Sequence, residues 1–115
     1  ACHDEAIRIS PNDPLVWAFM ASRSMALSLL ERFDEALDWA NRALQQPNAA
    51  MHARIAALVP LGHLGRRGEA SQPLEWLRRI RPDISIRFVR EILPITDPIC
   101  RARYEAGLLK AGLSE

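Results

Sequence analysis

The side chains best suited to bind a metal or to act as a nucleophile in this chain are three histidines and two cysteines. His3, His52 and His63 have no cysteine or carboxylate at the spacing that metal sites require. Cys100 has a nucleophilic side chain, but the histidine nearest to it in sequence is the distant His63, so an ordinary thiol is expected. The sequence therefore predicts no catalytic residues, no metal site and no cofactor.

Arginine is the other chemically distinctive residue, with fourteen arginines and a single lysine, Lys110. Such a bias is typical of GC-rich genomes, although guanidinium groups also bind phosphate and carboxylate. Arginines gather at 66–67, 78–81 and 87–90, on helices expected to lie on the outside. No aromatic residues alternate with them to stack bases, and the net charge is only +1. We expect a solvated face and no nucleic-acid partner.

Cys2 and Cys100 lie near opposite ends of the chain. Two cysteines placed this way in an extended stack of helices would not meet, so both are expected to be reduced thiols, which favours the cytoplasm. No apolar run approaches the roughly 18 residues of a membrane span, and no secretory signal is present. The chain opens inside a repeat and without Met, so we expect the C-terminal part of a longer protein.

The elements that would position any site follow from an internal repeat. Ala36 and Ala43 recur 34 residues later as Ala70 and Leu77, and a proline follows each pair. A period of 34 residues with two helices per repeat is the signature of tetratricopeptide repeats. The sequence predicts an all-α solenoid of helical hairpins in one domain, 1–115. Its expected parts are the end of a truncated repeat at 2–9, repeats at 14–47 and 49–82, and capping helices at 84–113.

Helix ends are marked by prolines, glycines and capping residues. Pro60 falls inside an expected helix, where it removes the hydrogen bond to the carbonyl of Ala56 and favours a kink. Thr96 or Asp97 is expected to cap the last helix, which Pro98 opens. The predicted helices span residues 15–31, 33–45, 49–64, 68–80, 84–93 and 99–111, with Gly112 ending the last one.

The inner, concave face of the stack is the expected binding surface, because first helices line that side in such repeats. The alternatives are that these positions are simply solvated, or that another repeat covers them. The expected partner-binding residues are Leu15, Ala18, Ser22, Met25, His52, Ile55, Val59 and, at the end of the second row, Gly62.

Three stretches add a more specific resemblance. They are Arg8 to Pro14, Phe33 to Leu44, and Arg103 to Glu115 with its closing Lys-Ala-Gly-Leu. These resemble the C-terminal repeat region of bacterial class III adenylate/guanylate cyclases and of related winged-helix regulators. The resemblance implies a sensory or assembly module joined to a catalytic or DNA-binding domain, and it transfers no active-site residue.

The segment 2–9 is expected to have lost its partner helix, so Ala6, Ile7 and Ile9 would lack cover. An open solenoid end exposes an apolar face, and we predict association through it, most simply as a homodimer. The sequence thus predicts a non-catalytic module for protein–protein contact or self-association in a larger bacterial signalling protein. The alternative is a ligand-sensing domain with a small molecule in the concave groove.

Overall fold

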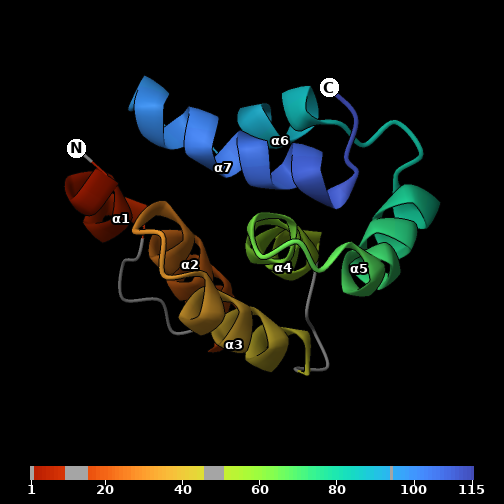
Figure 1. Ribbon diagram of the computed structural model, residues 1–115, viewed down its shortest axis with the longest axis horizontal. Coiled ribbons are helices and arrows are strands. Elements are labelled where there is room, and N and C mark those ends of the chain that lie inside the picture. The colour runs from red at the N-terminus through yellow and green to blue at the C-terminus, as the bar shows by residue number, and fades with distance from the viewer. Residues whose placement is uncertain (1, 10–15, 46–50, 94) are drawn as a thin grey trace.

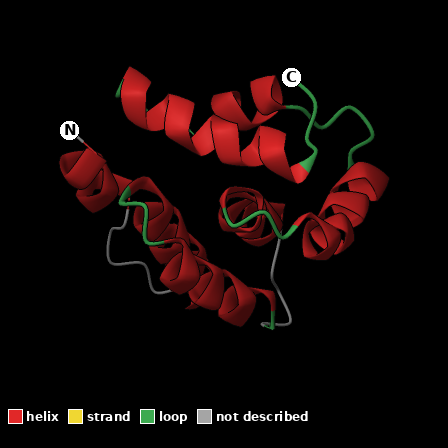
Figure 2. Cartoon of the chain, viewed as in Figure 1, coloured by secondary structure: helices red, strands yellow, loops and turns green. Residues whose placement is uncertain are grey.

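Helix α4 (Met51–His63) runs through the middle of the molecule, with α2, α3, α5 and α7 packed around it (Figure 1). The computed structural model describes residues 2–9, 16–45, 51–93 and 95–115. Within these residues the chain forms seven helices and no strand (Figure 2). The predicted all-α class is therefore confirmed.

The helix boundaries agree with the punctuation of the sequence to within about two residues, which is the ordinary uncertainty of a helix end. Besides α4, the helices are α1 (Cys2–Ile9), α2 (Val16–Leu29), α3 (Phe33–Leu44), α5 (Arg67–Ile80), α6 (Ile86–Ile92) and α7 (Pro98–Ala111).

Helix α3 packs closely on its neighbours because its buried stripe consists of small residues. Ala36, Ala40 and Ala43 are all fully buried, at spacings of three and four that place them on one side of the helix. The hydroxyl of Ser24 in α2 donates a hydrogen bond to the carbonyl of Ala36 at 2.6 Å. The close approach of α2 and α3 is thus built from small side chains and one polar contact.

The last helix begins and ends as its sequence predicts. The carboxylate of Asp97 accepts hydrogen bonds from the backbone N–H groups of Ile99 at 2.9 Å and Cys100 at 3.2 Å, and Pro98 occupies the first turn. Gly112 ends the helix with a φ of 111°, a left-handed conformation that favours glycine. Asp97, rather than Thr96, is the cap.

Pro60 does not end α4, which continues to His63. The proline is buried, and its carbonyl accepts a hydrogen bond from the N–H of Leu64 at 2.9 Å. A proline this close to the end of a helix costs one backbone hydrogen bond without preventing the final turn.

The expectation of an extended stack is wrong, because α7 folds back over α4 and α2 and reaches α1 (Figure 1). The radius of gyration is 12.5 Å, close to the roughly 13 Å of a compact domain of this length. The N-terminal helix α1 and the first turn of α7 are thereby brought together.

Candidate functional site

The inner face predicted to bind a partner is covered by α7. Ile55 and Val59 are fully buried and Met25 is 6% exposed, while Ser22 and His52 are half-buried. Leu15 and the side chain of Ala18 lie outside the described residues. Because Ile55, Val59 and Met25 belong to the hydrophobic core, the prediction that they line an accessible groove is wrong, and the alternative of a covered face holds for them.

A pair of glycines allows α7 to approach α4 so closely. A Cβ built on Gly62 would lie 2.0 Å from the carbonyl oxygen of Gly107, and one built on Gly107 would lie 2.7 Å from the carbonyl oxygen of Val59. Neither side chain could be accommodated unless the backbones separated. His63 adds a polar contact beside them, because its Nε2 lies 2.8 Å from the carbonyl oxygen of Arg103.

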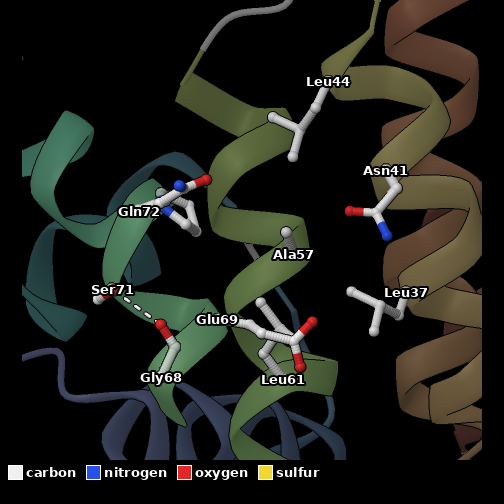
Figure 3. A pocket seen from close by; sticks show the side chains of 10 residues that line it. Leu37, Asn41, Leu44, Ala57, Leu61, Gly68, Glu69, Ser71 and Gln72 are labelled. Atoms are coloured by element: carbon white, nitrogen blue, oxygen red, sulfur yellow. Dashed lines mark hydrogen bonds between the residues drawn. The ribbon is translucent and has the colours of Figure 1, made fainter. Parts of the chain in front are cut away.

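An open cleft lies on the opposite side of α4. Its volume is about 400 Å³, and it is bounded by α3 on one side and α5 on the other (Figure 3). Ala57 and Leu61 of α4 form its apolar floor. Asn41 projects from the α3 wall and Gln72 from the α5 wall (Figure 3). The other lining residues are Leu37, Leu44, Gly68, Glu69, Ser71 and Pro73.

The cleft continues past Trp76. A second hollow of about 270 Å³ shares Leu44, Gln72 and Pro73 with the first and adds Arg54 and Trp76. The guanidinium of Arg54 lies 3.7 Å from the centre of the Trp76 ring, a cation–π arrangement, and burial lowers the pKa of Arg54. We call the two hollows together the α3–α5 groove.

Helical spacing explains why these side chains face the same groove. In α3, Leu37, Asn41 and Leu44 follow one another at steps of four and three. In α5, Gln72 and Trp76 are four residues apart. Such steps place residues on one face of a helix, so two neighbouring helices each present a mixed apolar and amide face toward the same gap.

The α3–α5 groove is lined by groups that form hydrogen bonds and apolar contacts. Carboxamides both donate and accept hydrogen bonds, and they stand above an apolar floor. Glu69 is the acidic lining residue, and its carboxylate accepts a bidentate hydrogen bond from Arg66, with one contact at 2.7 Å. This hydrogen bond raises the pKa of Arg66. The groove thus combines hydrogen-bonding carboxamides on its walls with an apolar floor.

The expected arginine patch is largely engaged within the chain. Arg78 donates to the carbonyl of Gly112 at 3.1 Å, and Arg90 forms a bidentate ion pair with Glu105, with one contact at 2.7 Å. Arg81 lies 4.0 Å from the centre of the Phe88 ring. These guanidinium groups tie α5, α6 and α7 together.

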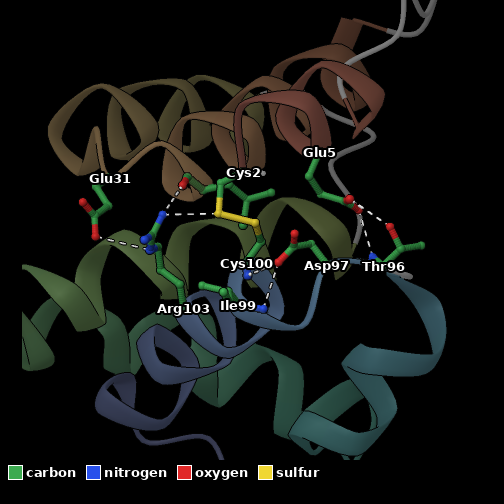
Figure 4. The surroundings of a disulfide bond; sticks show 9 residues. Cys2, Glu5, Glu31, Thr96, Asp97, Ile99, Cys100 and Arg103 are labelled. Carbon is green, nitrogen blue, oxygen red and sulfur yellow. Dashed lines mark hydrogen bonds and ion pairs between the residues drawn. A yellow bond between two sulfur atoms is a disulfide. The ribbon is translucent and has the colours of Figure 1, made fainter.

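Sequence reasoning missed a covalent contact between α1 and the first turn of α7. Cys2 and Cys100 form a disulfide, with their Cα atoms 5.5 Å apart (Figure 4). The expectation of two reduced thiols is wrong because α7 returns to α1. Reduced thiols therefore no longer support a cytoplasmic location. Ala6 is also covered, at 3% exposure, whereas the side chains of Ile7 and Ile9 lie outside the described residues.

The disulfide lies in a polar setting that we call the α1–α7 junction, made of Cys2, Glu5, Thr96, Cys100 and Arg103. The carboxylate of Glu5 is buried and accepts hydrogen bonds from the backbone N–H and the hydroxyl of Thr96, each at 2.9 Å. Arg103 donates to the carbonyl of Leu29 at 2.8 Å and to Sγ of Cys2 at 3.4 Å. Cysteines near both ends were the only signal of this junction in the sequence.

Comparison of the chain with protein-family models, with curated proteins and with solved structures gave no match. In the described part of the chain, no helix combines the length and the apolar character needed to cross a membrane. The same residues contain no group of three or more histidine, cysteine or acidic side chains placed to hold a metal ion.

Proposed function

We propose that this chain is a non-catalytic, tetratricopeptide-like interaction domain that binds an extended peptide segment of a protein partner in the α3–α5 groove. The observation that carries the proposal is the position of two carboxamides, Asn41 and Gln72, on opposite walls of an open cleft whose floor is apolar. An extended peptide has backbone N–H and C=O groups that carboxamides can pair with, and its alternate side chains can contact the floor.

The helix arrangement supports the repeat-domain part of the proposal. Helices α2 and α3 pack on each other, as do α4 and α5, and α2 also contacts α4 of the following pair. This succession agrees with the 34-residue spacing of Ala36 and Ala70. The resemblance to cyclase-associated repeat regions supports a role within a larger bacterial signalling protein.

Selection and titration test the proposal. Peptides selected from a random library displayed on phage would be synthesised and titrated into labelled protein, with binding followed by calorimetry and by nuclear magnetic resonance. The expected result is micromolar binding, with shifts confined to α3, α5 and the floor residues of α4. The double variant Asn41→Ala/Gln72→Ala should weaken binding at least about tenfold, since the peptide backbone would lose partners at both walls.

A matched control uses exposed positions outside the groove, one directly after α3 and one within α5. Gln45→Ala/Glu75→Gln should leave the affinity within about twofold, because neither side chain lines the groove. Peptides whose binding is indifferent to the Asn41/Gln72 pair would contradict the proposal. A small molecule found in the groove by native mass spectrometry, and competing with no peptide, would replace it with a ligand-sensing function.

A further inference from the structure

Helix α1 is joined to the rest of the molecule in a different way from α7. Tyr104 and Leu108 of α7 lie in the main hydrophobic core cluster, whereas among the described side chains of α1 Ala6 is buried outside that cluster and Cys2 packs at its edge. An eight-residue helix is too short to be stable in water alone. The disulfide, the Glu5–Thr96 contact and packing on α2 therefore hold α1 in place.

The two cysteines differ in their exposure to solvent. Cys2 is partly exposed, whereas Cys100 is fully buried. Cys100 also lies in the first turn of α7, where the helix dipole favours a negative charge. An external thiolate would thus attack Cys2, and the electron pair released from the S–S bond would move to Cys100.

Arg103 favours the second half of such an exchange. Its Nη1 lies 3.4 Å from Sγ of Cys2, so the guanidinium charge stabilises a thiolate formed there. Arg103 stays in position because the same group donates to the carbonyl of Leu29 and pairs with Glu31 at 3.2 Å. The charge is therefore held beside Sγ of Cys2 until α1 leaves.

We propose that Cys2–Cys100 is a thiol–disulfide exchange site, opened by a dithiol that attacks Cys2, and that its reduction releases α1 while the α2–α7 core stays folded. One thiolate of the dithiol bonds to Sγ of Cys2, and Cys100 leaves as a thiolate that takes up a proton. The second thiol of the reagent, as a thiolate, then attacks the reagent's own sulfur in the mixed disulfide and expels the Cys2 thiolate. The protein disulfide gains two electrons, and the dithiol loses two as it becomes a cyclic disulfide.

Release of α1 would uncover part of α2. Ala26 and Leu27 are 8% and 7% exposed, and they line a hollow of about 280 Å³ together with His3 and Ala6 of α1. The redox state of the pair would thereby control access to this face of α2.

Hydrogen exchange on the whole chain tests the release. The oxidised protein is treated with dithiothreitol near neutral pH without denaturant, and exchange is compared before and after. We expect full reduction and a rise of at least about tenfold in amide exchange over 2–9, while α4 and α7 change by less than about twofold. Failure to reduce the folded protein, or unfolding of α4 and α7 on reduction, would overturn the proposal.

Trapping identifies the attacked sulfur without any variant. Glutathione is added to the oxidised protein, the reaction is quenched with acid, and the mixed disulfide is located by peptide mapping. Glutathione should be found on Cys2 in roughly tenfold excess over Cys100. Predominant labelling of Cys100 would contradict the assigned order of attack.

Variants supply a second check. In the protein with its disulfide intact, Arg103→Met should slow reduction by dithiothreitol several-fold relative to Arg103→Lys, which retains the charge. The Cys2→Ser/Cys100→Ser protein should show the exchange pattern of the reduced chain and no response to dithiothreitol. Equal reduction rates for the two Arg103 variants would show that the guanidinium charge plays no part in the proposed exchange.

Discussion

The two opposite faces of α4 differ in what covers them. Ile55, Val59 and Gly62 lie at steps of four and three along one face, and these residues are buried beneath α7. Ala57 and Leu61, four residues apart, lie on the other side and form the floor of the α3–α5 groove. One helix thus has a closed face and a face with an opening above it.

The difference shows that the solvent exposure of each α4 face depends on whether small residues allow another helix to pack closely on it. Gly62 meets Gly107 with no room for a side chain, so α7 seals that face at close range. On the other face, α3 and α5 stand on either side of the α4 floor without contacting each other, and their amide-bearing faces leave a cleft. Glycines at the α4–α7 contact close one face of α4, and the larger polar residues of α3 and α5 leave the other face open.

Gly62→Ala is expected to have the largest effect of the substitutions considered. The new methyl group would lie 2.0 Å from a backbone oxygen of α7, so the two helices must separate. Overpacking of this kind costs about 1–3 kcal/mol, and a backbone obstacle places the loss at the upper end. Chemical denaturation should show a lower midpoint for the variant.

Gly68→Ala is the matched control, because Gly68 borders the groove and a Cβ there meets nothing within 4 Å. Gly68 is helical, within α5, so alanine should be neutral or stabilising by up to about 1 kcal/mol. Equal losses for the two variants would mean that the closed and open faces are packed alike, and the comparison would fail.

The sequence carries enough information to place the helices, since Asp97, Pro98 and Gly112 act through local backbone geometry. It also indicated the small packing residues Ala36 and Ala43, which are both fully buried. Such signals operate within a few residues, and for this reason they are readable without a tertiary structure.

The position of α7 could not be predicted in the same way. Its docking on α4 depends on Gly62 and Gly107, and each glycine alone resembles an ordinary helix interruption. Without that docking, Cys2 and Cys100 have no reason to meet, and the inner face of the repeats is expected to be open. The groove was missed because it depends on how α3 and α5 are placed on either side of α4, which is also a matter of tertiary packing.

Asp97→Ala should have an intermediate effect, since it weakens α7 at its first turn rather than at the α4 contact. The substitution removes the acceptor for the N–H groups of Ile99 and Cys100, and loss of such a cap costs about 1 kcal/mol. Thermal denaturation would measure it, with Asp83→Ala as a control. Asp83 forms an exposed ion pair with Arg81 at 3.3 Å, so its loss should cost less than about 0.5 kcal/mol. If Asp97→Ala lowered the free energy of unfolding more than Gly62→Ala does, the helix cap would contribute more to the stability of α7 than its contact with α4.

The smallest expected effect concerns the edge of the closed face, at His52. This histidine precedes Ile55 by three residues and Val59 by seven, so it shares their side of α4. It is half-buried, and burial lowers the pKa of the imidazole below its ordinary value of 6.5. The folded protein therefore prefers the neutral ring more strongly than the unfolded chain does.

The sign of the pH dependence follows from that preference. Above the unfolded pKa, near 6.5, both states hold a neutral ring and His52 adds no pH dependence. As the pH falls below it, the unfolded chain takes up a proton that the folded protein resists, so the free energy of unfolding decreases until the folded pKa is passed. Denaturation curves between about pH 7.5 and pH 5 should thus show a larger loss for the natural chain than for His52→Gln. Parallel pH profiles would mean that the His52 ring is well hydrated, and that the closed face of α4 opens to water at its N-terminal end.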